Sequence, residues 1–225
     1  MTAWSAASGV ATGPGSASWR MTRASHRAIR MAARVGASLA CAAAVLSLAA
    51  CTPRGTAVGD TQGRAPSPAH VGTMRDDAVI GVVGSATAAA DSVVLDAFSD
   101  AGIEAVYVSV KDSASGSSED SGHAAARAQQ GMRDMVSRVV NLIVVSDIDV
   151  TANADGWDAA LQDARNAGIP VALLSPVHAP DDERLYAATL AINDRAADAT
   201  PIDDAVMAIL NDEPHARQIT VSTVR

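Results

Sequence analysis

Small polar side chains follow each of the strongly apolar runs of this 225-residue sequence, and their hydroxyl, amide and carboxyl groups suit hydrogen bonding to a polar solute. The candidate ligand-binding residues of this kind are Ser85, Thr87, Ser146, Asp147, Ser175, Asn193 and Asp194. Trp157 adds an aromatic face for stacking. Two alternatives stay open: residues at strand ends are polar in any α/β protein because loops are wet, and Trp157 could instead pack against the loop at Tyr186.

The apolar runs have the composition of buried strands and alternate with helical patterns. Short runs rich in Val, Ile and Leu favour buried parallel strands, and apolar residues at three- and four-residue spacing favour the helices between them. The predicted strands are 78–84, 103–110, 141–146, 169–174, 187–192 and 219–224, and the predicted helices are 88–101, 123–139, 155–167 and 202–211. This alternation predicts an α/β fold with a doubly wound, mostly parallel sheet. Ligands of such sheets bind beyond the carboxyl ends of the strands.

Other kinds of site have weaker support. Residues 147–155 alternate oxygen-bearing side chains as a calcium loop does, but Thr151 and Gln162 stand where the first ligand and a bidentate Glu are required. We therefore predict no metal and expect Asp155 to cap the next helix. The segment Gly81–Ser85 lacks the Lys of a phosphate-binding loop. No Ser stands in a GxSxG turn, and the histidines beyond residue 51 have no partner at metal or triad spacing, so neither catalysis nor a cofactor is predicted.

The first 50 residues have the pattern of a targeting segment. They hold five arginines and no acid, and the 16-residue run Val35–Ala50 is uncharged and mostly small and apolar. Such a run is short for a membrane span but suits a secretory signal peptide behind a positive region. The residues Leu48–Cys51 look like the lipobox of bacterial lipoproteins, in which the peptide is cut before the Cys and a diacylglyceryl group is added to its sulfur. We predict a lipoprotein signal peptide over 1–50, with translation starting at Met1 or Met21, and lipidation of Cys51.

The rest of the chain is strongly acidic, because all 25 acidic side chains lie beyond residue 50. Such a body is repelled by phosphate, so no nucleic-acid partner is expected, and membrane contact is expected only through the lipid anchor. Removal of the signal would take Cys41 away and leave Cys51 alone, which excludes a disulfide. Residues 51–76 are rich in Gly, Pro, Thr and Ser and are expected to form a flexible linker. Residues 77–225 are expected to form the folded lobe.

Three segments in the middle of the chain carry a family resemblance: Asp155–Leu161 (DGWDAAL), Ala164–Val171 (ARNAGIPV) and Leu185–Tyr186. They resemble the first lobe of type I periplasmic sugar-binding proteins, the receptors of ABC transporters, and especially their galactofuranose-binding branch. The resemblance extends more faintly over residues 79–210. It implies a flavodoxin-like lobe, a small-molecule sugar as the ligand and an ABC permease as the partner.

The sequence departs from the pattern of that family in its extent and in its site residues. The resemblance covers the first lobe only, and the second lobe is expected to be truncated. Ser175-Pro176 stand where the family has an Asp-Arg pair, Asn193-Asp194 stand where it tends to Asp-Asn, and no aromatic residue follows the first predicted strand. Because serine makes weaker hydrogen bonds than a charged group does, sugar binding is expected to be weak or lost.

The sequence therefore favours a membrane-tethered solute-binding lipoprotein on the extracytoplasmic face of the cell membrane, related to the receptors of sugar importers. Two alternatives from other classes stay open. One is a non-catalytic envelope lipoprotein that contacts a partner through an exposed strand edge, and the other is a truncated receptor remnant without a ligand.

Overall fold

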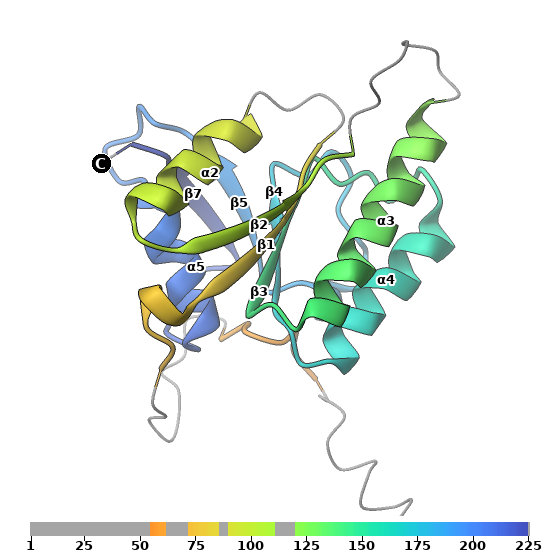
Figure 1. Ribbon diagram of the computed structural model, residues 1–225, viewed down its shortest axis with the longest axis horizontal. Coiled ribbons are helices and arrows are strands. Elements are labelled where there is room, and N and C mark those ends of the chain that lie inside the picture. The colour runs from red at the N-terminus through yellow and green to blue at the C-terminus, as the bar shows by residue number, and fades with distance from the viewer. Residues whose placement is uncertain (1–54, 62–71, 86–89, 111–119, 225) are drawn as a thin grey trace, which may run out of the picture. The chain divides into compact units, whose positions relative to one another are not determined.

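The computed structural model describes residues 55–61, 72–85, 90–110 and 120–224. Their strands form one seven-stranded sheet in the order β2-β1-β3-β4-β5-β7-β6, and every pair of neighbours is parallel (Figure 1). The first five strands have the flavodoxin-like order. The strands are β1 (Val79–Val83), β2 (Glu104–Val108), β3 (Leu142–Ser146), β4 (Val171–Leu174), β5 (Ala188–Ile192), β6 (Thr200–Pro201) and β7 (Gln218–Ser222).

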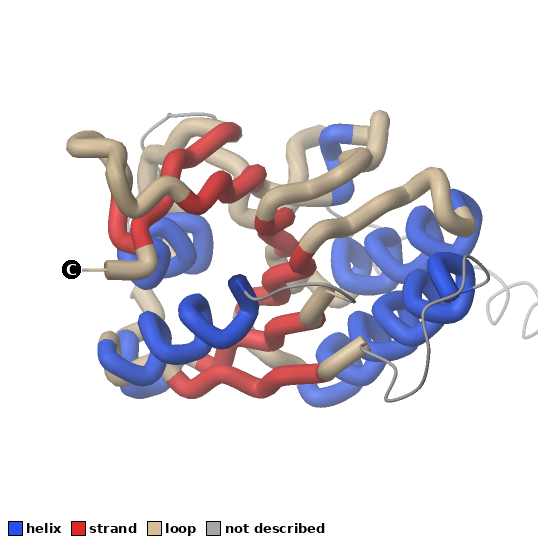
Figure 2. The backbone as a smooth tube through the Cα atoms, turned by 90° about the horizontal axis from the view of Figure 1, so that it is seen from above, coloured by secondary structure: helices blue, strands red, loops and turns tan. Residues whose placement is uncertain are grey.

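Helices cover both faces of this sheet. The helices α2 (Ala90–Asp100) and α5 (Ile202–Leu210) lie on one face, and α3 (Asp120–Arg138) and α4 (Ala154–Asn166) lie on the other (Figures 1 and 2). Each face has its own cluster of buried apolar side chains. The predicted α/β, doubly wound parallel fold is therefore confirmed.

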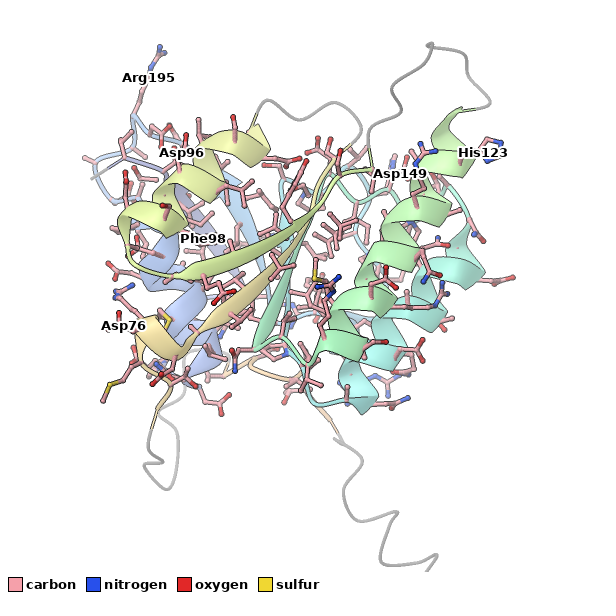
Figure 3. All side chains as sticks on the ribbon, in the orientation of Figure 1. Asp76, Asp96, Phe98, His123, Asp149 and Arg195 are labelled. Atoms are coloured by element: carbon pink, nitrogen blue, oxygen red, sulfur yellow. The ribbon has the colours of Figure 1, made fainter. Side chains whose placement is uncertain are left out.

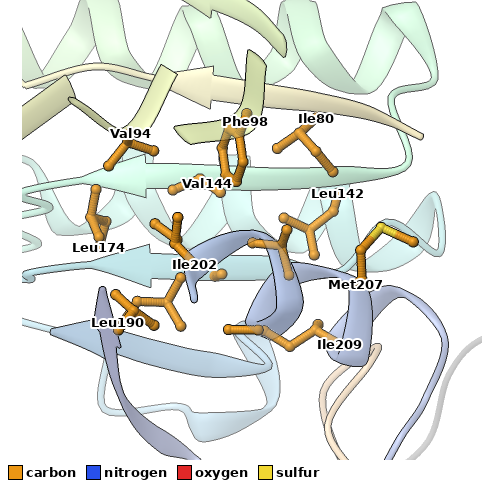
Figure 4. Close-up of a cluster of buried hydrophobic side chains, with 14 of the residues drawn as sticks. Ile80, Val94, Phe98, Leu142, Val144, Leu174, Leu190, Ile202, Met207 and Ile209 are labelled. Carbon is orange, nitrogen blue, oxygen red and sulfur yellow. The ribbon is translucent and has the colours of Figure 1, made fainter. Parts of the chain in front are cut away.

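The central strands are buried on both sides, which explains their unbroken apolar sequences. Every residue of β3 and β4 is buried, as is expected where helices cover both faces. In the first cluster, Phe98 of α2 is completely buried over the sheet near Val144 of β3 and Ile202 of α5 (Figure 4). Because the chain has few aromatic residues, aliphatic side chains fill most of the remaining core.

The predicted elements match the observed ones with small shifts at their ends. All six predicted strands and all four predicted helices are present, and α3 begins at Asp120 instead of His123. The two-residue strand β6 was not predicted, because a Thr-Pro pair carries no apolar pattern. Two single helical turns, η2 (Arg75–Asp77) and η3 (Glu183–Leu185), were also not predicted.

The expected flexible linker over 51–76 differs from the structure at two places. Residues 55–61 pack against the lobe, with Ala57 and Asp60 buried, and η2 leads directly into β1. The predicted signal peptide, the lipidated Cys51 and the possible start at Met21 lie outside the described residues. Within the described part of the chain, no helix combines the length and apolarity that a membrane span needs.

Candidate functional site

The carboxyl ends of β1 and β3 meet where the order of the sheet reverses. The chain runs from β1 to β2 on one side and then returns to β3 on the other side of β1. The helix that follows β1, α2, and the helix that follows β3, α4, lie on opposite faces of the sheet (Figure 2). Ligands of such sheets bind at this point. A pocket of about 160 Å³ lies at this position.

The pocket has one polar and one apolar part. Its polar lining comes from the ends of β1 and β3 and from the start of α4, and consists of Ser85, Ser146, Asp147, Asp149 and Trp157. Its apolar lining comes mainly from α3 and from the loops around it, and consists of Val110, Ala124, Ala125, Ala128, Ile148 and Ala152. A ligand with both apolar and hydrogen-bonding faces matches this lining.

Ser85 is held in place by two acidic side chains. Its hydroxyl donates to Oδ2 of Asp147 over 2.8 Å, and its backbone N–H donates to Oδ2 of Asp91 over 2.9 Å. The same Asp91 oxygen accepts the hydroxyl of Tyr107 over 3.0 Å. A Cβ atom at Gly84 would lie 2.3 Å from that hydroxyl and 2.6 Å from Asp91, so only glycine fits between β1 and these groups. The first polar residue of the pocket is thus fixed by contacts from α2 and from the end of β3.

The contact with Asp91 also changes the chemistry of Tyr107. Partial burial raises the pKa of the Tyr107 phenol above its ordinary value of 10.0, and the hydrogen bond and negative charge of Asp91 raise it further. The hydroxyl of Tyr107 therefore stays protonated and acts as a donor at neutral pH. Asp91 and Tyr107 were not expected from the sequence, although an acidic residue in the first turn of a helix is a recognisable signal.

Two residues of the pocket lining each carry a polar atom that has no hydrogen-bond partner among the described residues. The hydroxyl of Ser146 and Nε1 of Trp157 are both inaccessible to solvent and unpaired. The two residues are only 6% and 3% exposed, respectively. Leaving such a group unpaired costs about 1–3 kcal/mol. Because neither atom is accessible to solvent, a ligand in the pocket would reach them only after the lining had moved.

The burial of Trp157 decides between the two roles considered for it. At 3% exposure the indole belongs to the same buried cluster as Tyr186, so its ring is part of the core. Stacking of a ligand on a free face of Trp157 is therefore excluded in this structure. What remains for ligand contact is the small part of Trp157 that lines the pocket.

The rim of the pocket contains an exposed cluster around Asp149 (Figure 3). Oδ1 of Asp149 accepts the Thr151 hydroxyl over 2.6 Å and lies 3.0 Å from Nδ1 of His178. The Thr151 hydroxyl is the main cause that lowers the pKa of Asp149, and His178 contributes less. No group of three or more metal-ligating side chains occurs in the described residues. The side chain that caps α4 is Asn153, not the expected Asp155.

The other predicted site residues lie away from the pocket lining. Ser175 is exposed after β4, and the side chain of Asn193 accepts a hydrogen bond from the backbone N–H of Arg195. Asp194 accepts a 2.7 Å bond from the backbone N–H of Thr223, which with further bonds from the end of β7 lowers the pKa of Asp194. Thr87 lies outside the described residues. The structure thus brings together Ser85, Ser146, Asp147 and Trp157 and leaves the other described candidates apart.

The described strands and helices thus form an α/β, doubly wound lobe with a pocket where the order of the strands reverses. No protein-family model and no curated protein matches the chain. Solved structures do match, with low identity. A galactofuranose binding protein shares 22% identity, with 52% of this chain and 36% of that chain covered and a TM-score of 0.38.

Two further solved structures are complexes with sugars. The periplasmic binding protein of the arabinose ABC transporter from Shewanella sp. ANA-3, bound to α- and β-L-arabinofuranose, shares 14% identity over 65% of this chain and 55% of that chain, with a TM-score of 0.37. A protein from Mycobacterium smegmatis in complex with β-D-fucofuranose shares 18% identity over 64% of this chain and 54% of that chain, with a TM-score of 0.38. The chain spans about a third to just over half of these proteins. Two of these three, the galactofuranose and arabinose binding proteins, are of the kind that the sequence resembles.

Proposed function

We propose that this chain is a lipid-anchored, extracytoplasmic solute-binding protein that holds a monosaccharide weakly in the pocket between β1 and β3. The observation that carries the proposal is the pocket itself, which lies where the strand order reverses and combines hydroxyl and carboxyl groups with an apolar wall. A small solute that presents both hydroxyls and C–H groups matches such a lining.

The two-part lining suits a sugar better than a purely polar or purely apolar solute. A sugar ring presents C–H groups on its faces and hydroxyls at its edge. The alanines of α3 can cover the C–H face, while Ser85, Ser146 and Asp147 offer partners to the hydroxyls. At about 160 Å³ the pocket is smaller than the 300–1,000 Å³ typical of sites for drug-sized ligands, so a small solute fits it best.

Weak affinity follows from the small number of polar partners. Ser175, Asn193 and Asp194 do not line the pocket, so the polar lining on this lobe is limited to the ends of β1 and β3 and the start of α4. Serine hydroxyls form neutral hydrogen bonds, which are about half as strong as charge-assisted ones.

The membrane tether and the transporter partner are supported by the sequence. The arginine-rich start, the apolar run Val35–Ala50 and the lipobox-like Leu48–Cys51 support a lipidated Cys51 on the outer face of the cell membrane. An ABC permease would be the acceptor of the solute. Metabolic labelling with a radioactive fatty acid, compared between the full chain and Cys51→Ala, tests the anchor.

Thermal unfolding of the full chain in detergent, with and without monosaccharides, tests the binding. A binder present at 100 times its Kd should stabilise the lobe by about 2.7 kcal/mol. We expect galactofuranose or arabinose to raise the Tm, and Ser146→Ala to reduce that shift. Ser175→Ala is the matched control, because Ser175 follows the neighbouring strand β4 but does not line the pocket. If no sugar raises the Tm, the proposal is wrong and the envelope interaction protein becomes the better hypothesis.

A further inference from the structure

The geometry points to a fixed orientation of the lobe on the membrane: the amino ends of its strands face the bilayer, and the pocket opens away from it. This inference rests on the lipid anchor of the proposed function. It follows from how residues 55–61, here called the clasp, attach to the lobe at the amino ends of the strands (Figure 1).

The clasp is held by side chains from distant parts of the chain. Asp60 forms an ion pair with Arg217 at the start of β7, and the Asp60 side chain is 1% exposed. Nε2 of His215 donates to the carbonyl oxygen of Gly59 over 2.7 Å, and Nη1 of Arg165 at the end of α4 donates to that of Thr56 over 2.9 Å.

A further pair of hydrogen bonds closes the end of the clasp. The Thr61 hydroxyl donates to the carbonyl oxygen of Glu213 over 3.0 Å and accepts the backbone N–H of His215 over 3.2 Å. Partners at both ends and in the middle distinguish the clasp from a solvated linker.

Gly59 lets the clasp approach the lobe closely. Its φ of +79° lies in the left-handed region, and a Cβ atom there would lie 2.9 Å from both Cγ2 of Ile209 and Cβ of Pro170. Gly55 has a similar φ of +92°, but a Cβ atom there would meet nothing within 4 Å. The two glycines therefore form a matched pair, in which only one contributes to packing.

The attachment of the clasp shortens the tether to the membrane. From Cys51 to Gly55 the chain has four residue steps, which span about 14 Å at full extension. Any lipid on Cys51 is thus confined to the side where the clasp enters. Because all strands are parallel, the pocket lies at the opposite edge of the sheet, and five residues of strand add about 16 Å between the two edges. If all of residues 51–76 formed a flexible linker, neither the distance from Cys51 to the lobe nor the distance from the membrane to the pocket would be fixed.

Fluorescence transfer to a membrane dye tests this orientation. The full chain is produced in a bacterium that processes lipoproteins and reconstituted into phosphatidylcholine vesicles that contain a dye-labelled lipid. Two exposed positions receive a single labelled cysteine each. Asp76 lies before β1, and Arg195 lies after β5, at opposite ends of the lobe (Figure 3).

We expect the label at Asp76→Cys to transfer energy to the membrane dye more efficiently than the label at Arg195→Cys. Gly59→Ala should displace the clasp and reduce this difference at least twofold, whereas Gly55→Ala should preserve it. Circular dichroism and sugar binding report separately whether the Gly59→Ala lobe stays folded. The comparison of the two labels in the wild-type chain does not depend on this variant.

Equal transfer from both labels, or stronger transfer from Arg195→Cys, would overturn the orientation while leaving sugar binding and the anchor untouched. If Gly59→Ala leaves the energy transfer from both labels unchanged, the clasp does not set the orientation of the lobe. A chain that fails to float with the vesicles would overturn the lipid anchor, and this inference with it. A chain that binds no sugar but keeps the expected difference between labels would overturn only the proposed ligand.

Discussion

Replacement of Asp91 by Ala should destabilise the lobe through loss of two hydrogen bonds beside the pocket. The carboxylate is 4% exposed and accepts from Ser85 N–H and from the Tyr107 hydroxyl. Hydrogen bonds to a charged group contribute about 1.5–3 kcal/mol each. The other oxygen of Asp91 is buried without a partner, so its removal recovers about 1–3 kcal/mol. With central values of about 4.5 kcal/mol lost and about 2 kcal/mol recovered, the net loss should be about 2–3 kcal/mol, measured as the change in free energy of unfolding in urea.

The same substitution should leave a spectroscopic signature on Tyr107. Its phenol pKa is raised first by burial and then by Asp91, so Asp91→Ala should lower that pKa while burial keeps it above 10.0. Because the folded-state value lies above the unfolded one, the contribution of Tyr107 to stability is present below pH 10 and is lost as the pH rises through the folded pKa. Ultraviolet titration resolves this change, since the chain has only two tyrosines.

Asp96→Ala is the control for both measurements. Asp96 is exposed on the same helix, α2, so its removal should change neither the stability nor the Tyr107 titration (Figure 3). A loss below about 0.5 kcal/mol for Asp91→Ala, or an unchanged Tyr107 pKa, would refute the role assigned to Asp91.

Two further predictions concern the clasp and the pocket rim. Arg217→Ala should lower the free energy of unfolding in urea by about 3–4 kcal/mol, because it removes the cation beside the buried Asp60 and the stacking of Arg217 on Tyr186. Asp60→Ala should lower it by only about 1–2 kcal/mol, since Arg217 is 21% exposed. Equal losses for the two variants would contradict this asymmetry. Thr151→Ala should raise the pKa of Asp149 more than His178→Ala does, because the Thr151 hydroxyl is the larger cause of the low pKa of Asp149. Carboxyl NMR measures this pKa. A larger rise in His178→Ala would contradict the hydrogen-bond assignment.

The sheet could be predicted from the sequence because its central strands are covered by helices on both faces. Burial on both sides demands unbroken apolar runs, and such runs stand out in a sequence even without an alignment. The strand β6 lacks this signal, since it consists of Thr200–Pro201 and pairs with only two residues of β7. The order of strands and the side on which each helix packs are properties of the whole chain, and they came only from the structure.

The candidate site could be predicted only in part, because a residue's position at the end of one strand does not define its distance from residues at the ends of the other strands. Ser85, Ser146 and Asp147 share the pocket since β1 and β3 are neighbours at the reversal of strand order. Ser175 follows the next strand but is exposed outside the pocket. Asp91 was missed, because its role depends on the hydrogen bond that it accepts from Tyr107. Tyr107 lies on β2 and not on the helix that carries Asp91.

The clasp was hidden from the sequence for a similar reason. Its Gly-, Thr- and Ala-containing stretch has the composition of a linker, and its main partner, Arg217, lies 157 residues further along the chain. Composition describes a segment alone, whereas the ion pair of Asp60 with Arg217 depends on the fold that brings two distant parts of the chain together.

The clasp and the pocket lie at opposite edges of the sheet. The clasp attaches at the amino ends of the strands, and the pocket lies at the carboxyl ends of β1 and β3. The proposed transfer of a solute to a permease in the same membrane requires the pocket to approach that membrane. With the clasp closed and a tether of about 14 Å, the proposed orientation opposes this movement. Gly59→Ala should therefore free the lobe to turn while leaving the sugar affinity of the pocket unchanged, because Gly59 packs at the opposite edge of the sheet from the pocket.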